Sequence, residues 1–138
     1  MATNLMMDLR LMAAGAVLAI VAAGGPTSAS AQALTYTEAQ AAAGANAFRS
    51  GCSGCHGAQA QGAEAPALFG AQFDGNWRGV PAASLYDFIS QLMPADKPGS
   101  LTKDAYVSIM AHLFKLNGIP AGTAPLPIPP PPDMMIPK

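Results

Sequence analysis

The sequence predicts an all-α fold of three main helices joined by long loops. Apolar residues recur with helical spacing in three segments, and no segment alternates in the way a convincing strand would. A Gly/Ala-rich stretch without strong periodicity, residues 57–79, separates the first two of these segments. A loop of this length inside a compact domain usually surrounds something or carries function. We therefore expect a small helical domain that wraps around a bound group.

The first 31 residues have the pattern of a secretory signal peptide, which we exclude from the fold. Arg10 lies in a polar start, and the apolar run 11–25 follows it. This run has the length of a signal-peptide core and is shorter than the ~20 residues that span a bilayer. Small residues fit cleavage after Ala31 or after Ala33. An uncleaved membrane anchor is the alternative. We expect export to the periplasm, with only transient membrane contact through the signal peptide.

The first helix is expected to begin at Thr37. The sequence "TEAQ" has the form of a capping box, with Gln40 at the third helical position. The helix continues through "AAAGANAFRS", where Gly44 and Phe48 share one face. Because glycine costs about 1 kcal/mol relative to alanine inside a helix, Gly44 indicates that another backbone comes close there.

The second and third helices follow the long loop. The second is expected from about Pro81 to Leu92, because its apolar residues recur at i, i+3, i+4 and i+7 and Pro94 cannot continue it. The third is expected from about Lys103 to Asn117, with Thr102 as the N-cap residue. Gly118 after its basic last turn is a typical C-terminal signal.

The folded domain is expected to span residues 32–118, and residues 119–138 are expected to form a proline-rich tail. Eight prolines lie among residues 120–138. This composition is typical of an extended and mobile polyproline-II-like segment.

The charge balance argues against a nucleic-acid partner. Seven Lys and Arg residues face eight Asp and Glu residues, for a formal net charge of −1. The basic residues are scattered rather than gathered in a patch. Long-range steering of a protein partner should also be weak.

Cys52, Cys55 and His56 form the cluster "CSGCH", which holds both cysteines of the chain. Cys-x-x-Cys-His is the attachment signature of a c-type haem. Two thiols one helical turn apart can add across the vinyl groups of one porphyrin edge, and the next imidazole reaches the iron. A redox dithiol would need a strand before the motif. A structural zinc site would need four ligands, and His112 is the one further candidate. We expect haem c, with its iron bound by His56.

Met93 is the expected ligand on the opposite face of the iron. It follows a helix end, precedes Pro94 and opens a loop, so its thioether can reach inward from a rigid backbone. Met110 and His112 lie within the predicted last helix, where packing accounts for them. The alternative is a five-coordinate haem enzyme or ligand sensor in which Met93 is only structural.

Over roughly residues 37–122 the chain resembles class I c-type cytochromes with one haem. "GANAFRSGCSGCHG" fits the first helix of that family, in which Gly44 and Phe48 precede the haem motif. "IMAHLF" fits the segment that crosses this helix near its glycine, and His112 stands where the family usually has an aromatic residue. The resemblance implies the small cytochrome c fold around one covalently attached haem.

The resemblance also implies four further residues at the haem. "APALFG" resembles the Pro-x-Leu element, in which the carbonyl of Pro66 would accept a hydrogen bond from His56 and Leu68 would pack against the ring. "FDGNWRG" resembles the segment whose tryptophan binds a haem propionate. This assigns Trp77 to that role, with Arg78 as its charge partner. An ordinary loop Pro-Leu pair and plain core packing of Trp77 are the alternatives.

The expected function is periplasmic one-electron transfer rather than enzymatic catalysis. "MPADKPGSLTKDAY" with "NGIPAG" resembles cytochrome subunits that accompany quinoprotein (PQQ-type) dehydrogenases. That resemblance implies a dehydrogenase as the electron donor and an oxidase or another cytochrome as the acceptor. Methionine and histidine ligation favours a raised reduction potential.

Overall fold

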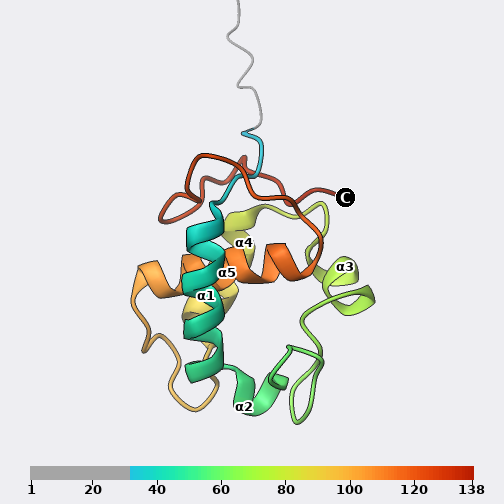
Figure 1. The fold of residues 1–138 in the computed structure, drawn as a ribbon, viewed down its shortest axis with the longest axis vertical. Coiled ribbons are helices and arrows are strands. Elements are labelled where there is room, and N and C mark those ends of the chain that lie inside the picture. Colours follow the sequence, from blue (N-terminus) through green and yellow to red (C-terminus); the bar gives the residue numbers. More distant parts are fainter. Residues whose placement is uncertain (1–31) are drawn as a thin grey trace, which may run out of the picture.

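The computed structural model describes residues 32–138, so the expected signal peptide lies outside the described residues. Its helices are α1 (Glu38–Gly51), α2 (Ser53–His56), α3 (Ala71–Trp77), α4 (Ala82–Leu92) and α5 (Lys103–Leu116) (Figure 1). The described extended segments meet only in isolated β-bridges. The all-α prediction is therefore confirmed. From residue 32 to the end, no helix is long and apolar enough to cross a membrane.

The boundaries of the main helices follow the capping signals in the sequence. Thr37 Oγ1 accepts a hydrogen bond from the Gln40 amide at 3.1 Å, and the Gln40 side chain accepts one from the Thr37 amide at 3.2 Å. Thr102 Oγ1 accepts a hydrogen bond from the Ala105 amide at 3.2 Å. Pro81 directly precedes α4. The two threonine side chains satisfy donors that the first turn of a helix leaves free, whereas Pro81 makes no side-chain cap hydrogen bond.

α1 crosses α5 at Gly44 (Figure 1). A Cβ atom built on Gly44 would overlap the backbone carbonyl of Ser108. The two backbones can therefore approach this closely only with glycine at this position. This close approach explains why a residue with poor helix propensity stands inside α1.

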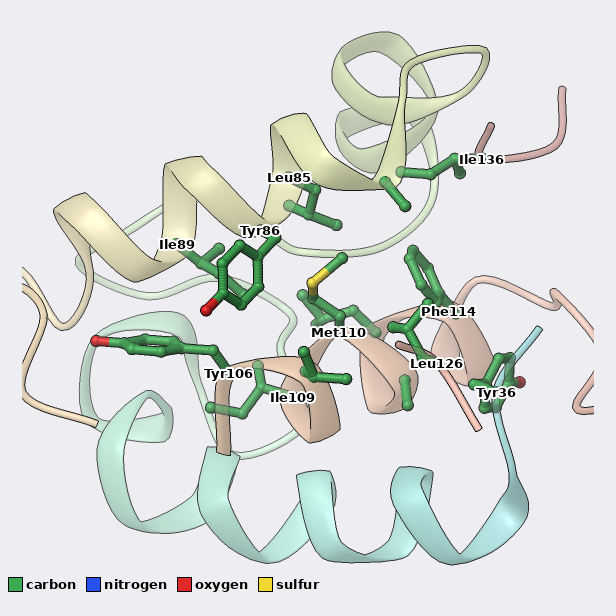
Figure 2. Packing of buried hydrophobic residues seen from close by; sticks show 14 of the residues in the cluster. Tyr36, Leu85, Tyr86, Ile89, Tyr106, Ile109, Met110, Phe114, Leu126 and Ile136 are labelled. Atoms are coloured by element: carbon green, nitrogen blue, oxygen red, sulfur yellow. The ribbon is translucent and has the colours of Figure 1, made fainter. Parts of the chain in front are cut away.

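α5 forms the centre of the core and packs against both α1 and α4 (Figure 2). Its buried residues are Tyr106, Val107, Ile109, Met110, Ala111, Leu113 and Phe114. From α4, Leu85, Tyr86 and Ile89 face this helix. Burial of an apolar stripe of this kind contributes most of the stability of such short helices.

The C-terminal segment 119–138 packs on the core, so the expectation of a separate, mobile tail is wrong. Leu126, Met134 and Ile136 are buried members of the main hydrophobic cluster. The Ile136 amide donates a hydrogen bond to the carbonyl of Val80 at 2.9 Å. The segment crosses the end of the molecule where α1 begins (Figure 1). The apolar side chains between the prolines supply the anchors that composition alone does not reveal.

Residues 57–79, expected to lack regular structure, contain the helix α3. α3 is seven residues long and α2 is four residues long. Helices of this length contain too few residues for an apolar periodicity to show. α3 places Phe73 and Trp77 one turn apart on the same face.

Candidate functional site

One cavity of about 670 Å³ brings together most residues of the expected site. Its walls include Cys52, Cys55, His56, Pro66, Leu68, Trp77 and Met93. The remaining walls are mostly apolar and include Phe48, Phe73, Leu85, Phe88, Ile89, Ile109 and Leu113. The volume lies within the range of about 300–1,000 Å³ that is usual for ligand and cofactor sites.

The two thiols and the imidazole reach the cavity from a single helical turn. α1 ends at Gly51, and the amides of Cys55 and His56 both donate to the carbonyl of Cys52, at 3.2 and 3.0 Å. Both cysteines are free thiols; Cys52 is half-buried and Cys55 is exposed. Burial, reinforced by Cys55, raises the pKa of the Cys52 thiol. The pair is thus unbridged and spaced for two separate bonds to one partner.

His56 is oriented by the loop that follows it. Its Nδ1 lies 2.7 Å from the carbonyl oxygen of Pro66. A carbonyl oxygen can only accept, so Nδ1 donates this hydrogen bond, and in the neutral ring Nε2 is then the nitrogen with the free lone pair. The loop folds back through hydrogen bonds from the Gly62 amide to the His56 carbonyl at 2.8 Å and from the Ala65 amide to the Cys55 carbonyl at 3.0 Å. The imidazole therefore has the tautomer that a metal ligand needs.

Asn117 holds the next part of this loop against α5. Its Nδ2 donates to the carbonyl of Leu68 at 3.0 Å, and its Oδ1 accepts from the amide of Gly70 at 3.0 Å. The amide of Leu68 also donates to the carbonyl of Ala60 at 2.9 Å. Leu68 is fixed in the cavity wall as a result. Asn117 is not predicted as a site residue from sequence, because its position as the last residue of the predicted helix indicates only the end of that helix.

Trp77 forms the cavity wall on the side of α3. Its ring packs edge-on against Phe88 of α4, with 5.4 Å between ring centroids. Gln72 and Asn76 of α3 also line this cavity and are not among the predicted site residues. Gln72 and Asn76 are separated by four residues, as Phe73 and Trp77 are, so in a helix the two pairs lie on adjacent faces. This spacing was the one indication in the sequence that they lie near Trp77.

Arg78 is directed away from the cavity. Its guanidinium donates to Asp74 at 2.9 Å, to the carbonyl of Pro137 at 3.2 Å and to the carbonyl of Asn117 at 2.7 Å. It is not among the residues that line the cavity. These contacts connect α3 to the end of α5 and to the C-terminal segment. The structure therefore does not bring Arg78 together with the other predicted site residues.

Met93 enters the cavity from the end of α4. Its amide donates to the carbonyl of Ile89 at 3.0 Å, which closes the helix. Its carbonyl oxygen accepts from the hydroxyl of Tyr106 at 2.7 Å and from the Gly99 amide at 3.3 Å. Met93 is half-buried and faces the same cavity as His56.

His112 lies outside this cavity. Its ring packs against Phe48, with centroids 5.5 Å apart, and it is half-buried. Burial lowers the pKa of His112, and the charges of Arg49 and Lys115 lower it further. These contacts are those of a side chain that packs between α1 and α5.

The donor set of the cavity fits a covalently attached haem. Two free thiols, one imidazole with an available Nε2 and one thioether meet at a single, mainly apolar cavity. A structural zinc site fits less well, because within residues 32–138 no group of three or more His, Cys, Asp or Glu side chains is placed to hold a metal ion.

Comparisons with known proteins point to one family. The family model described as "Cytochrome C oxidase, cbb3-type, subunit III" matches residues 39–113. No curated protein matches the chain. The sulfane dehydrogenase SoxCD of Paracoccus pantotrophus is 28% identical over 57% of this chain and 44% of that chain, with a TM-score of 0.48. Cytochrome CL of the marine methylotroph Methylophaga aminisulfidivorans is 30% identical over 58% of this chain and 55% of that chain, with a TM-score of 0.46. The chain spans about half the length of these solved structures.

Proposed function

Because this chain belongs to the cytochrome c family whose model matches residues 39–113, with haem c as its cofactor, we propose that it is a periplasmic one-electron carrier with His56 and Met93 as axial ligands. Family membership supports electron transfer through haem c. The ligand pair, the compartment and the partners are the proposal. One observation carries it: the imidazole of His56 and the thioether of Met93 line the same cavity as the two free thiols.

Cys52 and Cys55 attach the haem through two thioether bonds. Their spacing over one turn supports this role, since both thiols then reach the same edge of one cofactor. When bound, the haem supplies the one-electron couple between Fe(II) and Fe(III). Covalent attachment prevents loss of the cofactor from a domain with a modest core.

His56 ligates through Nε2. The hydrogen bond between its Nδ1–H and the Pro66 carbonyl holds the ring in one orientation and makes the imidazole a stronger base. Asn117 supports this arrangement from behind, because it fixes Leu68 two residues after Pro66. Leu68 packs against the face of the ring system.

Met93, which lines the same cavity as His56, would supply the second ligand to the iron. A neutral thioether favours Fe(II) over Fe(III) and raises the reduction potential. The apolar walls favour the same oxidation state, since they offer little solvation to the additional positive charge. If His56 and Met93 both held the iron, no position would be open to a substrate, as expected of an electron carrier.

Trp77 would donate its indole N–H to a haem propionate. Its place in the cavity wall and its packing on Phe88 support this role. We leave Arg78 out of the proposed site, because its donors already meet Asp74 and two backbone carbonyls.

Electrons enter and leave near Cys55, the exposed member of the thiol pair. We propose a periplasmic dehydrogenase of the quinoprotein class as the donor, because the segment 93–106 resembles cytochrome subunits that accompany such dehydrogenases, and an oxidase or another cytochrome as the acceptor. The small net charge implies that docking depends on short-range contacts rather than on long-range steering.

Absorption spectroscopy of the haem-loaded protein tests this function. The pyridine haemochrome should report two saturated vinyl groups, and the oxidised protein should show the weak far-red band of methionine-ligated ferric haem. The double variant Cys52→Ser with Cys55→Ser is the control, in which covalently bound haem should be lost. A high-spin wild type that readily binds carbon monoxide when reduced would instead support the five-coordinate alternative.

A further inference from the structure

Tyr106 of α5 has one hydroxyl group that contacts both ends of the loop between α4 and α5. The hydroxyl donates to the carbonyl oxygen of Met93 at 2.7 Å and accepts from the amide of Leu101 at 3.3 Å. Tyr106 is 3% exposed, and its side chain also lines the cavity. The buried Tyr106 hydroxyl therefore joins the first and last residues of the segment 93–101 through two hydrogen bonds.

The other hydrogen bonds of this segment are local. The Lys97 amide donates to the carbonyl of Pro94 at 2.9 Å, and the Ser100 amide donates to that of Lys97 at 3.2 Å. The Gly99 amide reaches the Met93 carbonyl at the longer distance of 3.3 Å. Most residues from 95 to 100 are exposed, so they supply few packing contacts. Met93 and Leu101 at the two ends of the segment pack on the core, and the Tyr106 hydroxyl adds the side-chain hydrogen bonds that join these two ends to α5.

We propose that Tyr106 is a positioning residue that holds Met93 in its ligating position and limits replacement of the thioether by an external ligand. This inference rests on the proposed function, since it takes Met93 as the axial ligand. Tyr106 does not itself ligate; it acts through the backbone of Met93.

Tyr106 is expected to act by shifting the balance between a closed state, in which Met93 is bound, and an open state, in which the loop has moved. An external ligand binds only when the loop has moved and taken the thioether away from the iron. Its apparent affinity therefore equals its intrinsic affinity multiplied by the fraction of open protein. Both hydrogen bonds of Tyr106 exist in the closed arrangement, so they lower that fraction. Removing the hydroxyl should raise it.

Tyr106→Phe removes the hydroxyl and keeps the ring. Tyr86→Phe is the matched control, because Tyr86 is 8% exposed in the same core and does not line the cavity. Imidazole is titrated against the oxidised, haem-loaded proteins, and loss of the far-red band is followed. The free energy of unfolding by denaturant is measured in parallel for each protein.

We expect Tyr106→Phe to bind imidazole about tenfold more tightly than wild type, a factor in keeping with the loss of up to two hydrogen bonds. Tyr86→Phe should bind imidazole as wild type does. If Tyr106→Phe loses stability while its imidazole affinity stays at the wild-type value, the hydroxyl is merely structural and the proposal is wrong.

A second measurement needs no variant, so it tests the role of Tyr106 even if Tyr106→Phe does not fold into a stable protein. In wild type, the hydroxyl proton of Tyr106 should be protected from solvent exchange in NMR spectra, and this protection should fall when imidazole displaces Met93. Unchanged protection would overturn the proposal. Failure of the proposed function looks different: the wild type itself would then lack the far-red band, whatever the behaviour of Tyr106→Phe.

Discussion

Nδ1 of His56 lies 2.7 Å from the carbonyl oxygen of Pro66, ten residues further along the chain. This contact fixes the tautomer of the imidazole that faces the cavity. The loop that supplies the carbonyl is in turn held by Asn117, which bonds Leu68 and Gly70. The orientation of one ring thus depends on a side chain at the end of α5.

Asn117→Ala should lower the free energy of unfolding of the haem-loaded protein by about 2 kcal/mol, because it leaves the partly buried carbonyl of Leu68 without this partner and also removes the exposed hydrogen bond to the Gly70 amide. Denaturant titration measures the loss. Asn46→Ala on the exposed side of α1 is the control and should change stability by less than about 0.5 kcal/mol. Equal effects of the two substitutions would show that the hydrogen bonds of Asn117 to Leu68 and Gly70 contribute nothing to the free energy of unfolding.

Gly44→Ala should destabilise the protein by about 3 kcal/mol, since its Cβ would overlap the Ser108 carbonyl at the crossing of α1 and α5. Gly75→Ala is the matched control. Gly75 also lies inside a helix, and a Cβ there meets nothing within 4 Å. Thermal unfolding should therefore show a small gain for Gly75→Ala, up to about 1 kcal/mol. Gain of stability in Gly44→Ala would contradict the close crossing.

Ile136→Ala tests the packing of the C-terminal segment on the core. Ile136 is fully buried, so its truncation should cost about 3 kcal/mol in unfolding free energy. Met135 is its neighbour and is 39% exposed, so Met135→Ala should cost less than about 1 kcal/mol. A segment that detaches in solution would give two small and similar values in denaturant titrations.

Features set by local sequence could be predicted. The capping box at Thr37, the apolar stripes of α4 and α5, and the Cys-x-x-Cys-His spacing each depend on residues within one or two turns. The close approach at Gly44 was also foreseen, because a glycine inside a helix requires a reason. The placement of Met93 at a helix end followed from the proline after it.

Features set by contacts between distant residues could not be predicted. Tyr106 is one example, because nothing near it in sequence indicates that its hydroxyl reaches the Met93 carbonyl. Arg78 stands beside Trp77 in sequence, yet it extends to the carbonyl of Asn117, 39 residues away. The C-terminal segment was judged by its prolines, whereas its place is set by the burial of Ile136.

The stability of the protein should fall with acid because of His112. Its pKa is lowered in the folded protein from 6.5, chiefly by burial, with Arg49 and Lys115 adding to the effect. Between the lowered value and 6.5 the unfolded chain binds more protons than the folded one, so stability rises with pH across this window. His112→Phe should flatten the pH dependence of unfolding below about pH 6.5 relative to wild type. An unchanged profile would show that His112 titrates alike in both states.

In the proposed function Met93 completes the coordination begun by His56, and redox titration of Met93→Ala is the decisive measurement. Wild type, Met93→Ala and the control His112→Ala are titrated under the same conditions, with oxidised spectra recorded alongside. We predict that Met93→Ala loses the far-red band, binds external ligands and has a lower reduction potential, because the thioether that favours Fe(II) is gone. His112→Ala should match wild type in all three respects. Identical spectra and potentials for wild type and Met93→Ala would contradict the account.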